Sequence, residues 1–154
     1  MRHCLFRLVI ALASQVALPT SGNAAVITRC VAPTGYSYFF AGALVPVKNS
    51  GMQSDAISTG QYLLMQSEHG DADIIFSDTS GRTISSKDDG GTIIVVSKTA
   101  KTIVILVNYP EMSVETWIFN IDTFGTGVVT VSQARYGEAA FVRKHALMSA
   151  KCRR

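Results

Sequence analysis

The chain has 154 residues, of which 47% are hydrophobic and 16% are charged, and its 14 basic and 11 acidic residues give a formal net charge of +3 at pH 7. This length is typical of one domain with one hydrophobic core. Two of the basic residues, Arg2 and Arg7, lie near the N-terminus, so the rest of the chain is close to neutral, with Lys and Arg scattered along it. The absence of a basic stripe excludes the electrostatic signature of a nucleic-acid-binding protein.

The first 25 residues have the three parts of a secretory signal peptide. Arg2 and Arg7 form a positive start, residues 8–18 form a short apolar run, and small residues precede a cleavage site near Ala24 and Ala25. The apolar run is shorter than the roughly 20 residues that cross a bilayer. We therefore expect cleavage and not anchoring.

The cysteines support export. Cys4 leaves with the predicted signal peptide, and only Cys30 and Cys152 remain. In an oxidising compartment these two residues can form a disulfide that closes nearly the whole mature chain. The sequence predicts a periplasmic or secreted single β-rich domain of residues 26–154, without a transmembrane segment.

Short runs of β-branched and aromatic residues recur along the mature chain, with glycine-containing turns between them. The predicted strands are residues 37–40, 61–66, 73–77, 83–86, 92–97, 102–109, 114–121 and 128–133. We expect an all-β fold, an antiparallel meander that forms a small β-sandwich or a barrel, and the sequence does not choose between the two.

The clearest hairpin joins residues 102–109 to residues 114–121. Pro110 has no backbone N–H to donate to a sheet, so it belongs in the turn. The first strand is apolar on both faces, which predicts a central position. In the second strand, Trp117 and Phe119 share one face, and we expect Glu115 on the opposite face.

Two segments are less regular. Residues 137–151 suit a helix or a strand, and we expect a final strand at residues 146–151 because Cys152 must reach Cys30. Residues 48–59 form the longest irregular segment in the mature chain. They are the candidate for a functional loop.

Catalytic groups are few. The mature chain has two histidines, His69 in a turn and His145 near the tail, and it contains no Gly-x-Ser-x-Gly motif. We interpret both histidines as surface residues and expect no catalytic residue. A hydrolase that uses His69 or His145 with an aspartate remains an alternative.

Aspartates gather between residues 71 and 89. Asp71, Asp73, Asp78, Asp88 and Asp89 supply the kind of oxygens that bind Ca²⁺. Their spacing lacks the Asp-x-Asp-x-Asp-Gly loop and its closing Glu, and aspartates are common at hairpin tips. We therefore predict no metal site and no cofactor.

Four residues are candidates for binding. Tyr36 and Tyr38 lie in an aromatic segment, and Arg135 and Tyr136 follow the strand predicted at residues 128–133. Aromatic side chains stack on the flat faces of sugars and peptides, but they also fill small β cores.

The chain shares its overall pattern with one group of proteins. The segments that carry this similarity are residues 30–38, 74–78, 85–91, 107–110 and 115–119 and the closing Cys152. In them the chain resembles small, functionally uncharacterised exported proteins of soil and plant-associated alphaproteobacteria. The resemblance implies export and a compact domain, and it implies no activity and no functional residue.

These observations favour a non-enzymatic exported β-domain that binds a protein, a peptide or an envelope component through its loops or one sheet face. An alternative is a barrel that inhibits a protease or binds a small ligand. Against a ligand-binding barrel, we expect the Ile, Leu and Phe side chains of the predicted strands to fill the interior.

Overall fold

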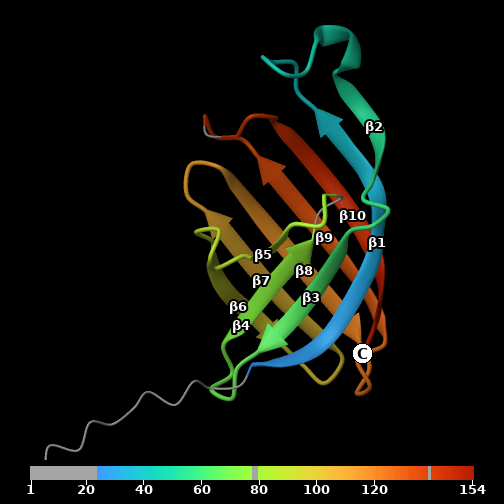
Figure 1. Ribbon diagram of the computed structural model, residues 1–154, viewed down its shortest axis with the longest axis vertical. Coiled ribbons are helices and arrows are strands. Elements are labelled where there is room, and N and C mark those ends of the chain that lie inside the picture. The colour runs from blue at the N-terminus through green and yellow to red at the C-terminus, as the bar shows by residue number, and fades with distance from the viewer. Residues whose placement is uncertain (1–23, 78–79, 139) are drawn as a thin grey trace, which may run out of the picture.

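The computed structural model describes residues 24–77, 80–138 and 140–154 (Figure 1). Most of the predicted signal peptide, including Cys4, lies outside the described residues, as does Asp78 of the aspartate group. The first strand begins at Ala25, at the predicted cleavage site. Among the described residues, no helix has the length and apolar character needed to cross a bilayer.

One antiparallel sheet of ten strands curls into a half-barrel, which confirms the all-β prediction (Figure 1). The strands are β1 (Ala25–Phe39), β2 (Gly51–Ala56), β3 (Gln61–Gln66), β4 (Ala72–Ser77), β5 (Thr83–Ser85), β6 (Thr92–Lys98), β7 (Thr102–Tyr109), β8 (Ser113–Ile121), β9 (Gly127–Arg135) and β10 (Lys144–Arg153). Their order in the sheet is β5-β4-β3-β1-β10-β9-β8-β7-β6, and β2 pairs with β1.

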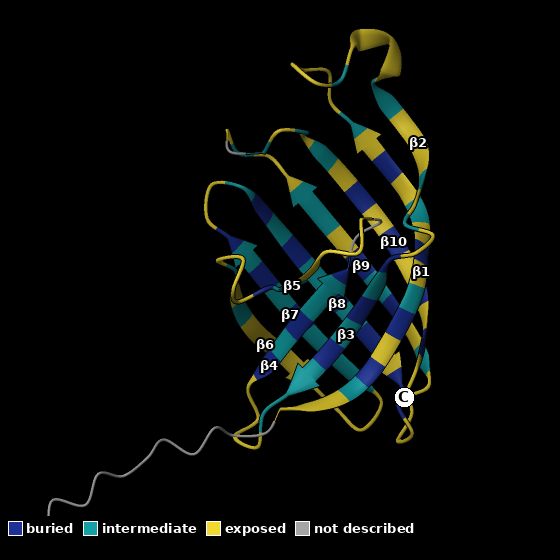
Figure 2. Cartoon of the chain, viewed as in Figure 1, coloured by how far each residue is buried: buried dark blue, intermediate teal, exposed yellow. Residues whose placement is uncertain are grey.

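The hairpin predicted around Pro110 is confirmed as β7 and β8, which pair from Thr102 with Asn120 to Tyr109 with Ser113. The ambiguous tail contains a strand, because β10 pairs with β1 on one side and with β9 on the other. Figure 2 shows buried and exposed residues alternating along β10, as expected for a strand with one face inside the barrel.

The long first strand changes partner halfway along. One edge of β1 pairs with β10, whereas the other edge pairs with β3 up to Val31 and with β2 from Thr34 onwards. The change occurs at a bulge where Ala32 has a φ of 49° and donates its backbone N–H to the carbonyl of Gly60 (2.9 Å). Further along, Gly35 leaves room for β10, because a Cβ at this position would lie 2.0 Å from the Leu147 carbonyl oxygen.

The prediction that residues 48–59 are irregular is wrong. A 3-10 turn at Val47–Asn49 precedes β2 in this segment. The strand pairs only with β1, and its inward residues Gln53 and Asp55 are polar. It therefore lacks the apolar alternation by which a strand is identified in a sequence.

The half-barrel has two different halves. The lower half contains Cys152 and the start of β1, and the upper half ends in the loops of residues 40–50 and 136–143 (Figure 1). Because β3, β4 and β5 cover only the lower half, the concave face of β1, β8, β9 and β10 is open above them.

The lower half holds the hydrophobic core. Leu64, Ile74, Ile105, Phe119 and Val129 are each at most 1% exposed. The predicted disulfide is present here: Cys30 and Cys152 occupy directly paired positions of β1 and β10, with their Cα atoms 3.9 Å apart.

Candidate functional site

A cavity of about 340 Å³ lies where the open upper half meets the filled lower half. Its apolar lining is formed by Ile57, Tyr62, Phe76, Trp117, Val131, Ala146 and Met148, and its polar lining by Ser77, Glu115, Gln133, Arg135 and Lys144. We call it the mouth cavity. Its volume is at the lower end of the range for small-molecule sites.

The floor of the mouth cavity is aromatic. The rings of Tyr62 and Trp117 are perpendicular, with centroids 4.8 Å apart, and Trp117 in turn stacks on Phe119 at 6.2 Å. Tyr62 and Trp117 are 7% and 3% exposed, so the core beneath fixes both rings. This packing gives a rigid, apolar surface on which a ligand can rest.

A buried carboxyl group stands beside this floor. Glu115 is 7% exposed, and its two carboxyl oxygens accept hydrogen bonds from Trp117 Nε1 (3.0 Å) and Gln133 Nε2. Burial raises the pKa of Glu115 above its ordinary value, and the two hydrogen bonds and the charge of Arg135 offset only part of this effect. The burial of Tyr62 and the charge of Glu115 raise the pKa of the Tyr62 hydroxyl group.

The expected orientation of Glu115 is wrong. Residues 115, 117 and 119 of β8 are all buried and lie on the same side of the strand, because side chains alternate with a period of two. Glu115 therefore faces the interior together with Trp117 and Phe119.

A second polar group joins β1, β2 and β10 on the upper concave face. Asp55 Oδ2 accepts hydrogen bonds from Lys144 Nζ (2.8 Å) and from Ser37 Oγ (2.6 Å). Burial alone would raise the pKa of Asp55, but the hydrogen bonds from Lys144 and Ser37 and the charge of Lys144 hold it below its ordinary value. The Lys144 cation is thus already paired inside the protein.

Arg135 is different. It is the last residue of β9, and it lines the mouth cavity on the same face as Gln133 and Val131. It makes no hydrogen bond or ion pair with any of the described residues. The residue as a whole is exposed to solvent.

The structure separates the four predicted binding residues. Arg135 lines the mouth cavity, whereas Tyr36 and Tyr38 lie on the outer face of the sheet, 64% and 43% exposed. Tyr136 is 52% exposed and lines a different cavity.

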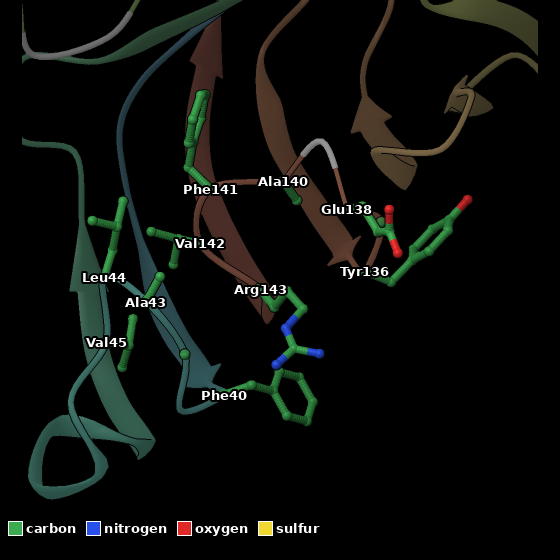
Figure 3. Close-up of a pocket in the computed structure, with 12 residues that line it drawn as sticks. Phe40, Ala43, Leu44, Val45, Tyr136, Glu138, Ala140, Phe141, Val142 and Arg143 are labelled. Atoms are coloured by element: carbon green, nitrogen blue, oxygen red, sulfur yellow. The ribbon is translucent and has the colours of Figure 1, made fainter.

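That second cavity, of about 310 Å³, lies between the two upper loops (Figure 3). Phe40, Tyr136 and Arg143 line it together with Leu44 and Phe141. Figure 3 shows that Phe141 points away from Phe40 and Arg143, and the Phe141 and Leu44 side chains are 88% and 63% exposed. This loop cavity is therefore a shallow space between exposed side chains, without a packed floor.

The remaining candidates lie outside both cavities. His69 is exposed in the turn after β3, and His145 is exposed on the outer face, where its ring contacts Phe40 at a centroid distance of 5.2 Å. Asp73 accepts a hydrogen bond from Ser85 Oγ (2.6 Å), whereas Asp71, Asp88 and Asp89 are exposed. Within the described ranges, no three His, Cys, Asp or Glu side chains are grouped as metal ligands.

Glu115, Gln133 and Lys144 were not predicted as site residues from the sequence. One signal was available: a glutamate two residues before Trp117 in a strand marks a charged side chain on a buried face.

No family model matches the chain, and comparisons with curated proteins and with solved structures found no similar protein.

Proposed function

We propose that the protein binds a small molecule with an apolar body in the mouth cavity. The observation that carries this proposal is the unfilled space of about 340 Å³ above the buried Tyr62 and Trp117 rings, next to a polar wall. A concave, mostly apolar cavity with a few convergent polar groups is typical of small-molecule sites.

The expected filling of the interior by apolar side chains holds for the lower half and, in the upper half, for the β7 side, where Tyr109 is buried. Elsewhere in the upper half the inward positions carry smaller or polar residues, such as Ser37 on β1, Ala146 on β10 and Gln133 on β9. These side chains leave the space that Phe119 and Ile105 occupy lower down.

We also propose that the protein works in the periplasm or outside the cell, as the signal-like N-terminal segment suggests. The buried Cys30–Cys152 disulfide supports this compartment, because such bonds persist where the environment is oxidising.

Trp117 supplies the test, because it is the only tryptophan of the chain and lies in the cavity floor. Octanol, a small neutral amphiphile, is titrated into the protein while the tryptophan fluorescence is recorded. We expect a saturable change, because the probe replaces water at the indole ring.

A matched pair of variants shows where the probe binds. Ala146→Leu adds bulk inside the cavity, and Ser149→Leu adds the same side chain on the outer face of the same strand. Binding is expected to weaken in the first variant and to persist in the second, with circular dichroism reporting the fold of both. No saturable change in the folded native protein, or equal binding by both variants, would contradict the proposal.

A second candidate function is contact with a protein, a peptide or an envelope component. It rests on the outer aromatic patch, which we define as Tyr36, Tyr38, Met52 and Leu147. These residues lie on paired strands, Tyr36 opposite Leu147 and Tyr38 opposite Met52, and each is between 43% and 67% exposed. Contiguous exposed apolar residues mark interaction surfaces.

The double variant Tyr36→Ser with Tyr38→Ser tests this second function. Native protein and a control variant, Ser149→Ala, are coupled to a support and incubated with envelope extract. A protein that both retain and the double variant loses would support the patch as a docking surface. Identical retention by all three would exclude it.

A further inference from the structure

We infer that the mouth cavity selects ligands with a carboxylate head group and that Arg135 binds this group. The inference rests on the proposed function and adds the chemical class of the ligand. It depends on the charged groups that face the cavity, namely Glu115, Arg135 and Lys144.

Two of these three charges are already occupied inside the protein. Lys144 forms its ion pair with Asp55 at 2.8 Å, and the two side chains are only 18% and 20% exposed. The oxygens of Glu115 accept hydrogen bonds from Trp117 and Gln133. Neither group offers a strong, free contact to a ligand.

Arg135 is the charged group that remains for a ligand, since it has no hydrogen-bond or ion-pair partner among the described residues and acts on Glu115 only through its charge. A guanidinium group presents a planar fork of N–H donors that matches the two oxygens of a carboxylate. A cationic ligand would approach this positive charge and would compete with Trp117 and Gln133 for Glu115. The cavity therefore favours an anionic head over a cationic one.

The inward face of β9 orients the ligand. Along this face Val129 and Val131 are buried, Gln133 is half-buried, and Arg135 is exposed at the end of the strand. The distance from Val131 to Arg135 along the strand is about 13 Å, from a rise of about 3.3 Å per residue. An apolar chain can thus lie on the aromatic floor while its carboxylate reaches Arg135.

The test compares three probes of equal chain length, octanoate, octanol and octylamine, by Trp117 fluorescence. We expect octanoate to bind about tenfold more tightly than octanol, because its carboxylate forms one charge-assisted hydrogen-bonded contact with Arg135. In Arg135→Gln the two probes should bind equally. Arg29→Gln removes the same charge from an exposed position of β1 outside the cavity, and the preference should persist in it.

Arg135→Lys separates charge from geometry. It keeps the positive charge and loses the planar fork, so its preference for octanoate is expected to lie between those of the native protein and Arg135→Gln. Circular dichroism establishes that each variant is folded.

The outcomes distinguish this inference from the function on which it rests. Equal binding of octanoate and octanol by the native protein overturns the carboxylate preference but leaves the ligand cavity. Tightest binding of octylamine also overturns it and points to Glu115 as the anchor. Failure of all three probes to bind overturns both proposals.

Discussion

The two halves of the half-barrel use the same strands for different purposes. On β8, Trp117, Phe119 and Ile121 fill the lower half, whereas Glu115 and Ser113 occupy the equivalent inward positions above them. The lower part of the strand stabilises the fold, and the upper part lines a cavity. The difference shows that stability and binding can be divided along the length of a strand as well as between strands and loops.

The division follows from how far the covering strands extend. β3 and β4 have only six residues each, and β1 leaves β3 at the Ala32 bulge to pair with β2. Below this point the inner face is covered and dry, so large apolar residues are favoured there. Above it the inner face is only partly covered. Polar side chains such as Asp55 and Lys144 occupy this part of the face, where they pair with each other and stay partly exposed.

Truncation of a phenylalanine in each half should give the largest contrast. Phe119 is fully buried, and Phe119→Ala is expected to lower the free energy of unfolding by about 3–5 kcal/mol because it leaves a cavity in the core. Phe39→Ala makes the same change on the partly exposed upper part of β1 and should cost much less. Chemical denaturation measures the free energy of unfolding of both variants. Equal losses would show that the two halves do not differ in how much they contribute to stability.

Reduction of the disulfide tests the lower half next. Opening the Cys30–Cys152 bond frees a loop of the unfolded chain that spans 122 residues, and we expect a loss of about 2–5 kcal/mol and a clearly lower melting temperature. Thermal melts with and without reductant measure the effect, while alkylation and intact mass count the free thiols. An unchanged melt with both thiols free would rule out a stabilising role.

The smallest effect concerns Glu115 in the upper half. Because the folded state raises the pKa of this carboxyl group, its ionisation opposes folding, and the cost grows as the pH rises through the raised pKa. The stability of the native protein relative to Glu115→Gln should therefore fall as the pH rises above about 4, the ordinary pKa of glutamic acid, and should become constant once the pH exceeds the raised pKa.

Denaturation of both proteins across this pH range measures the relative stability, with Glu68→Gln as the control for an exposed glutamate. A difference that stays constant with pH, or that grows in favour of the native protein as the pH rises, would contradict the raised pKa.

Local patterns predicted the strands that lie in regular hairpins. The alternation around Pro110 located β7 and β8, and the cysteine count identified the Cys30–Cys152 bond. β2 was missed because it pairs only with β1, along one of its edges, and because its inward side chains are polar. The first part of β1 was missed because it directly follows the signal-like segment.

The mouth cavity could not be predicted, because it depends on how far strands that are distant in sequence extend along the half-barrel. Tyr62 on β3, Trp117 on β8 and Ala146 on β10 meet there only after the whole sheet has curled. The position of Glu115 was accessible, since the two-residue period places it beside Trp117. Arg135 was identified as a candidate by its position after a strand, but nothing in the sequence indicated which cavity it lines.

The place of β1 in the sheet has a consequence for the order of folding. Its partners are β2 and β3 on one edge and β10, more than 100 residues later, on the other. The sheet can therefore not be completed until residues 144–153 have been synthesised, and such long-range pairing is slow. We expect a chain of this topology to stay unfolded for a long time after its start has left the ribosome, until its last strand has been synthesised.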